Sequence, residues 1–153
     1  MPRRRPKPSA APGAVFVDSS ALIAYFSADD ANHAHAAAGV RRAAAERAAL
    51  LTSNLVLAEV HRLLLFRAGI RAAAAALSAM TRSHLVRIHY ARSSDHLAAH
   101  GWIERLGDQV ITLTDAVSFA IMTAERCRVA LSFDRDFWIA GFEPWQAHVS
   151  RRR

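Results

Sequence analysis

The stretch AVFVDSS, residues 14–20, decides how this chain folds. The apolar run from Ala14 to Val17 is typical of a short, buried strand in a parallel sheet. Asp18 ends the run, and the polar oxygens of residues 18–20 are suited to capping a helix predicted at 21–27. Because the carboxyl ends of strands in an open α/β sheet face the ligand, Asp18 is a candidate site residue. Its ability to cap a helix leaves a purely structural role open.

The same alternation of strand and helix continues along the chain. Further strands are predicted at 50–52, 85–89 and 129–133, with a last edge strand at 146–149. Helices are predicted between them, at 29–49, 55–67, 70–84, 93–107 and 115–126. Since parallel strands need crossover connections, we expect an α/β fold with about four or five short strands flanked by helices on both faces.

Length and composition indicate one globular domain. The chain has 153 residues, and its 52% hydrophobic content excludes a mostly disordered protein. The single cysteine, Cys127, excludes a disulfide framework and a zinc site built from cysteines. No apolar run approaches the roughly 20 residues that span a membrane, and we expect a cytoplasmic protein.

The net charge of +7 lies in the two ends of the chain. Residues 1–12 form a basic, proline-rich segment that we expect to be a flexible tail, and Arg151 to Arg153 form a second basic tail. The domain at 13–150 is neutral. The tails would strengthen contact with phosphates if they bind nucleic acid, but charged termini are commonly just solvated.

Three further acids stand in unusual surroundings. Glu59 lies mid-helix at the margin of an apolar face, where the alternative to a site role is an ion pair with Arg62. Asp115 falls in the first turn of its helix, where an acid also favours the helix dipole. Asp134 follows an apolar strand and is alternatively a turn residue, with Asp136 close enough to share or replace its role.

In a parallel α/β fold these acids can face one another, and we predict that Asp18, Glu59, Asp115 and Asp134 form one site. Two carboxylates about 4 Å apart repel by about 4 kcal/mol at an effective dielectric of 20. A divalent cation would remove that cost. Ligands that are all oxygen favour Mg²⁺ or Mn²⁺ over zinc.

The segments that hold these acids resemble a known family. They are VFVDSSALIAYF, LTSNLVLAEVHRLLL, LTDAVSFAIM and LSFDRDFWIAGF, which look like the four motifs of PIN-domain proteins, in order, and most of all like the VapC toxins of bacterial and archaeal toxin–antitoxin systems. The resemblance covers about residues 14–148. It implies a PIN-like parallel sheet and carries over the same quartet, with Ser20 and Ser132 as supporting hydroxyls.

The resemblance also implies an activity and partners. The expected protein is a toxin of a type II system, an Mg²⁺- or Mn²⁺-dependent endoribonuclease. Its expected partners are RNA, a cognate VapB-like antitoxin and a second copy of itself. Arg62 and Arg135 are candidates for contact with the RNA backbone.

Two other functions stay open from the sequence. One is a PIN-fold nuclease of ordinary RNA processing with no antitoxin. The other is a catalytically inactive RNA-binding module, which the complete set of acids disfavours. The aromatic side chains of Trp102, Trp138, Phe142 and Trp145 either stack on RNA bases or pack in the core.

Overall fold

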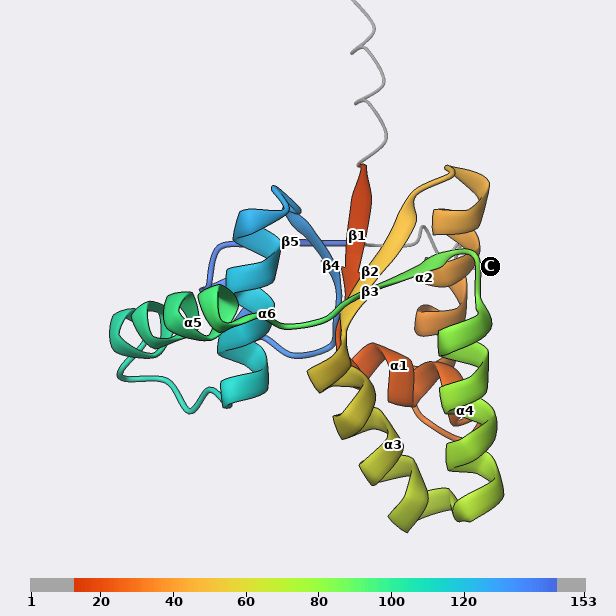
Figure 1. Ribbon diagram of the computed structural model, residues 1–153. Helices are drawn as coiled ribbons and strands as arrows, with labels where there is room; N and C mark the ends of the chain where they lie inside the picture. Colours follow the sequence, from red (N-terminus) through yellow and green to blue (C-terminus); the bar gives the residue numbers. More distant parts are fainter. Residues whose placement is uncertain (1–12, 146–153) are drawn as a thin grey trace, which may run out of the picture.

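One parallel sheet organises the computed structural model, which describes residues 13–145 (Figure 1). Its five strands run in the order β3-β2-β1-β4-β5. They are Ala14–Val17 (β1), Ala49–Ser53 (β2), Val86–His89 (β3), Val129–Leu131 (β4) and Glu143–Pro144 (β5). The expected α/β class is confirmed. The tails at 1–12 and 151–153 and the strand expected at 146–149 lie outside the described residues.

Helices cover both faces of this sheet. They are Ser19–Phe26 (α1), His33–Ala45 (α2), Asn54–Ala68 (α3), Ile70–Arg82 (α4), Ser93–Arg105 (α5), Leu113–Ala124 (α6) and Asp136–Ile139 (α7). In Figure 1, α5 and α6 lie on one side of the strands and α1 to α4 on the other. A single residue separates β1 from α1, and α3 follows β2 directly. The first turns of both helices therefore stand at the carboxyl edge of the sheet.

The register of the strands determines which residues share that edge. Val17 pairs with Leu131 in β4, and Ser53 pairs with His89 in β3. The Thr52 hydroxyl donates to the Val17 carbonyl at 3.0 Å, which keeps β2 level with the end of β1. Asp18 therefore lies at the carboxyl end of the central strand, between the ends of β2 and β4.

Several predicted boundaries differ from the structure, and side-chain hydrogen bonds explain two of them. The helix expected from about residue 29 begins at His33, because the Asp30 carboxylate accepts the Asn32 N–H at 2.8 Å and forms a turn instead. The strand expected to reach Phe133 ends at Leu131. There the N–H groups of Phe133 and Asp134 donate to serine hydroxyls rather than to a neighbouring strand.

The core is built from both faces of the sheet and contains most of the aromatic residues. Trp102 and Trp145 are 9% and 6% exposed, so both pack in the protein interior and are not free to stack on RNA. Trp145 also donates its indole N–H to the Gly39 carbonyl at 3.0 Å, which joins the end of the described chain to α2. Within residues 13–145, no helix is long and apolar enough to cross a membrane.

The close approach of α2 to β4 gives a first prediction about stability. A Cβ added at Gly39 would lie 2.8 Å from Leu131 Cδ1, and Leu131 is 4% exposed within the core, where its side chain has little room to shift. We expect Gly39→Ala to lower the free energy of unfolding by about 1–3 kcal/mol through overpacking, measured by urea denaturation. Gly101→Ala is the control, because its added Cβ meets nothing within 4 Å. Equal stability of the two variants would contradict the expected clash.

Candidate active site

Asp18 is buried at the end of β1, where its carboxylate caps α1. It is 2% exposed, and its Oδ2 accepts from the Ser20 hydroxyl at 2.8 Å and the Ser132 hydroxyl at 3.0 Å. Burial raises the pKa of Asp18, the hydroxyls of Ser20 and Ser132 oppose that rise, and the nearby Asp115 carboxylate adds to it. Asp18 is thus both a helix cap and a destabilised buried acid.

Ser20 and Ser132 connect Asp18 to the turn that holds Asp134. Their hydroxyl oxygens lie 3.3 Å apart. Ser20 Oγ accepts the Phe133 N–H at 2.9 Å, and Ser132 Oγ accepts the Asp134 N–H at 3.0 Å. The two hydroxyls expected to support the site therefore bind Asp18 on one side and fix the backbone before Asp134 on the other.

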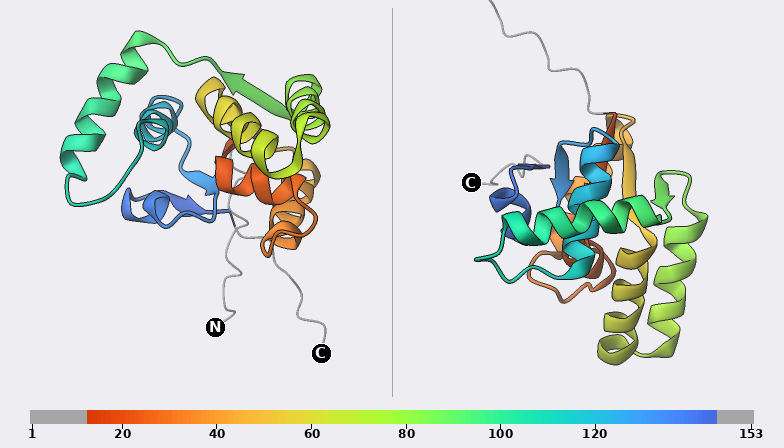
Figure 2. Two further views of the ribbon diagram at one scale, coloured as in Figure 1. Left: turned by 90° about the horizontal axis from the view of Figure 1, so that it is seen from below. Right: turned by 60° about the vertical axis from the view of Figure 1, so that its left-hand side comes forward.

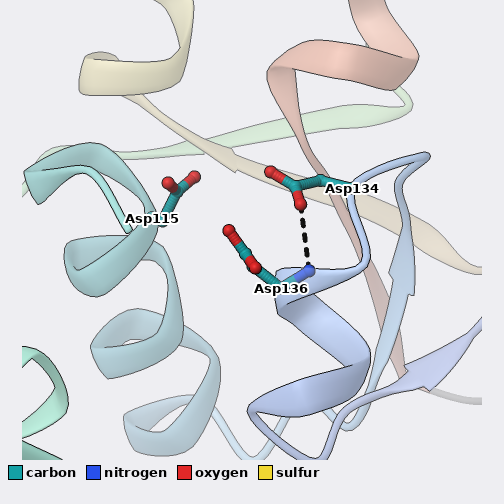
Figure 3. A group of neighbouring side chains, drawn as sticks. All are labelled: Asp115, Asp134 and Asp136. Carbon is teal, nitrogen blue, oxygen red and sulfur yellow. Dashed lines mark hydrogen bonds between the residues drawn. The ribbon is translucent and has the colours of Figure 1, made fainter. Parts of the chain in front are cut away.

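Three carboxylates come together beside this turn (Figure 3). One oxygen from each of Asp115, Asp134 and Asp136 lies within 4.8 Å of the other two. Asp134 Oδ1 accepts the Asp136 N–H at 2.9 Å, which folds the turn so that both acids face Asp115. Asp134 and Asp136 were alternatives in the sequence, and the structure brings both of them to Asp115.

Asp115 is fixed by the start of α6. Its Oδ2 accepts from the Thr112 backbone N–H at 2.9 Å and from the Thr112 hydroxyl at 2.7 Å, while its own N–H donates to Thr112 Oγ1 at 3.1 Å. This reciprocal cap is encoded by the Thr-x-x-Asp spacing. Both donors bind Asp115 Oδ2. Asp115 Oδ1 has no hydrogen bond to any residue in the range 13–145, so it can face the other two acids.

The charges of this cluster are poorly balanced. Burial raises the pKa of Asp136, and the carboxylates of Asp134 and Asp115 raise it further, while only Arg135 lowers it. Arg135 is exposed, so its opposing effect is screened by water. A divalent cation bound among these carboxylates would offset their mutual repulsion.

Glu59, on α3, also has a carboxylate oxygen that a bound cation would satisfy. Its Oε2 is a buried side-chain oxygen with no hydrogen-bond partner among the described residues. Among residues 13–145 no ion pair joins Glu59 to Arg62, whose guanidinium lies 5.7 Å from the Phe66 ring centre instead. A buried acceptor without a donor costs about 1–3 kcal/mol or more, which a bound cation would offset.

The structure does not gather the whole predicted quartet into one tight group. Asp18 and Glu59 lie outside the three carboxylates whose oxygens meet within 4.8 Å. Asp18 is nevertheless close enough to Asp115 for the two charges to interact. The donors are all carboxylate oxygens, which fits a hard divalent cation such as Mg²⁺ or Mn²⁺.

A second set of polar residues at this edge was not predicted from the sequence. The Asn54 side chain accepts the Ala91 N–H at 2.8 Å, and His89 Nε2 lies 2.8 Å from the buried Asp95 carboxylate. Ser53 caps α3, which leaves the Asn54 side chain for this contact. These contacts depend on the pairing of β2 with β3, so local sequence carries no signal for them.

A parallel α/β sheet with carboxylates gathered at its carboxyl edge is the arrangement expected of an acidic nuclease. The model of the PIN domain family matches residues 15–142. The chain therefore belongs to the PIN-domain family.

Relatives from Mycobacterium tuberculosis narrow this class. The chain is 38% identical over 128 residues to the 23S rRNA-specific endonuclease VapC20 of two strains, covering 84% of this chain and 95% of the relative. The crystal structure of VapC20, described as a sarcin–ricin loop cleaving toxin, superposes with a TM-score of 0.75 at 37% identity. The superposition covers 84% of this chain and 96% of the VapC20 chain. The expected resemblance to VapC toxin ribonucleases is confirmed, and the chain is an endonuclease of this group.

Proposed function

We propose that this protein is the toxin of a type II toxin–antitoxin system and hydrolyses a phosphodiester bond in the sarcin–ricin loop of 23S ribosomal RNA. The observation that carries the proposal is the group of Asp115, Asp134 and Asp136 beside Asp18. It occurs in a chain that aligns with nearly the whole of a relative named for that substrate. An inactive RNA-binding module is disfavoured because it has no need of so many unbalanced acids.

We propose Mg²⁺ or Mn²⁺ as the cation, held by Asp115 with Asp134 and Asp136, and assisted by Asp18 and Glu59. A cation bound there supplies Lewis-acid polarisation of the phosphodiester and lowers the pKa of a water molecule. The described carboxylates hold the negative charge that attracts it. Without the cation, the same carboxylates repel the RNA phosphate and limit how closely it approaches, since like charges repel.

The serine pair has a positioning role in this proposal. By donating to Asp18 Oδ2, Ser20 and Ser132 hold the carboxylate in one orientation and partly oppose the rise in its pKa that burial causes. Two exposed arginines are suited to binding RNA phosphates: Arg135, which immediately precedes α7, and Arg62, on α3 about one turn beyond Glu59.

The substrate is tested by sequencing the 5′ ends of cellular RNA after the protein is induced, with Asp18→Asn beside the wild type. A single new 5′ end in the sarcin–ricin loop, absent from the variant, is expected. Cuts spread over many messenger RNAs would contradict the proposed substrate but not the nuclease activity.

The partners are tested by expression in the cytoplasm, where the proposed toxin meets ribosomes. Expression alone is expected to arrest growth, and coexpression with the product of a neighbouring small reading frame, the proposed VapB-like antitoxin, to restore it. Light scattering of the purified protein tests the proposed homodimer. Normal growth with an active nuclease would favour an RNA-processing enzyme without antitoxin.

The roles of Asp134 and Asp136 give a second prediction. Since both reach Asp115, we expect Asp134→Asn and Asp136→Asn each to weaken Mn²⁺ binding, by about tenfold or more, measured by isothermal titration calorimetry. Asp29→Asn, which changes an exposed acid in the α1–α2 connection, is the matched control and should bind normally. Normal binding by one of the two variants would assign the ligand to the other acid.

The raised pKa values of Asp18 and Asp136 give a third prediction. Both acids hold protons at a higher pH than the ordinary value of about 3.9. Mn²⁺ must displace these protons, so its affinity should fall as the pH drops toward 5, measured by calorimetry in buffers of different ionisation enthalpy. In the metal-free protein, the folded state binds more protons at these two groups than the unfolded state does. Their contribution to the free energy of unfolding should therefore rise as the pH falls toward 4. Affinity independent of pH in this range would contradict the assignment.

A further inference from the structure

The loop between β3 and α5, residues 90–92, extends the carboxyl edge of the sheet away from the acids. His89 pairs with Ser53 at the end of β2, and β2 pairs in turn with β1. Two strand spacings, roughly 10 Å, therefore separate the end of β3 from Asp18. Seen from below, the loop runs past α3 and α6, the helices that carry Glu59 and Asp115 (Figure 2, left). It lies within reach of an RNA that extends beyond the cleaved bond.

Two large side chains of this loop face solvent. Tyr90 is 67% exposed, in contrast to the buried Trp102 and Trp145. The Arg92 side chain is 68% exposed, and its Nε stays 3.8 Å from the Asp95 carboxylate, which leaves most of the guanidinium in water. An aromatic ring that stacks on a base and a guanidinium that binds a phosphate are the two groups that single-stranded RNA contacts most readily.

The backbone beneath these side chains is held at consecutive residues. The Ala91 N–H donates to the Asn54 side chain at 2.8 Å, and the Arg92 N–H donates to the Asp95 carboxylate at 2.8 Å. Because the backbone is already ordered, binding need not order the loop and costs only the conformational entropy of the two side chains. A loop that recognises a ligand needs such an anchored backbone, whereas a turn that is only solvated does not need it.

A buried charge network explains why the loop is so well anchored. Asp95 is 3% exposed and lies 2.8 Å from His89 Nε2, while His89 Nδ1 is 3.6 Å from Glu125 at the end of α6. Glu125 also pairs with Arg87 at 3.0 Å. Burial raises the pKa of Asp95, but hydrogen bonds from the Arg92 backbone and His89 outweigh it, and the net pKa is lowered. The carboxylate stays ionised and continues to hold the loop at neutral pH.

We propose that Tyr90 and Arg92 form a second RNA contact, in which Tyr90 stacks on a base and Arg92 binds a backbone phosphate a short distance from the cleaved bond. This inference rests on the proposed function as an RNA endonuclease. Because the two residues are remote from the reacting atoms, they bind the substrate equally in its ground and transition states. Their loss should therefore raise KM and leave kcat unchanged.

The test uses the full-length protein and an RNA hairpin that carries the sarcin–ricin loop sequence. Stacking on one base is worth about 1–3 kcal/mol, so Tyr90→Ala should raise KM by about 5- to 160-fold, while Tyr90→Phe should retain wild-type values. Arg92→Gln should raise KM and lower the slope of log affinity against log salt by about 0.7 to 1. Fluorescence anisotropy of the hairpin in EDTA should show the same losses in Kd without cleavage.

Two matched variants test whether position matters. Arg82→Gln removes an exposed arginine from the last turn of α4, beside the opposite, amino end of β3. Ile70→Ala removes an apolar side chain that is 78% exposed at the start of α4. Both should bind RNA normally. Equal losses in Arg82→Gln and Arg92→Gln, or wild-type binding by Tyr90→Ala, would overturn the inference. Wild-type protein that cleaves neither the hairpin nor ribosomes would instead count against the proposed function.

Discussion

Replacing Asp18 with asparagine is expected to lower the rate of RNA cleavage by about 10³-fold or more, equivalent to about 4 kcal/mol of transition-state stabilisation. The side chain keeps its shape and its neighbours Ser20 and Ser132, but it loses the negative charge that would help to hold the cation. Single-turnover cleavage of ribosomal RNA at saturating Mn²⁺ measures the effect.

The same substitution should not harm the fold. Burial and Asp115 raise the pKa of Asp18, which means that the ionised carboxylate destabilises the folded, metal-free protein. Asp18→Asn should therefore be at least as stable as the wild type near pH 7 in urea denaturation with EDTA. Adding Mn²⁺ should stabilise the wild type more than the variant. Strong cleavage by a folded Asp18→Asn protein would remove Asp18 from the active site.

The largest loss of stability is expected from Phe119→Ala, at about 3–5 kcal/mol in the free energy of unfolding. Phe119 is fully buried on α6, and its ring centre lies 5.4 Å from that of Trp102, 5.0 Å from Phe137 and 5.6 Å from Phe142. These contacts attach α6 to α5 and α7. Since domains of this size are stable by only about 5–15 kcal/mol, the loss is a large fraction of the total.

Urea denaturation followed by far-UV circular dichroism measures this loss. Leu97→Ala on α5 is the control, because Leu97 is 72% exposed and its removal leaves no cavity. Phe119 matters to the site because the same helix carries Asp115 toward Asp134 and Asp136. A loss below about 1 kcal/mol would show that the aromatic cluster collapses around the missing ring.

Features set by short-range spacing were predictable from the sequence alone. The apolar run before Asp18 determines a buried strand, and Thr112 with Asp115 determines a reciprocal helix cap. Both depend only on side-chain periodicity or on hydrogen bonds across three residues, which the chain carries in its local order. The family motifs add the same acids in the same order, and the model of the family matches residues 15–142.

Tertiary structure alone decided how the acids meet. Ser20 and Ser132 are far apart in sequence, yet their hydroxyls shorten β4 and turn Asp134 and Asp136 together toward Asp115. The unpaired oxygen of Glu59 and the anchored loop at 90–92 also became evident only in the folded chain. The physical reason is that these contacts follow from strand register, which fixes residues from distant segments side by side and leaves no trace in any one of them.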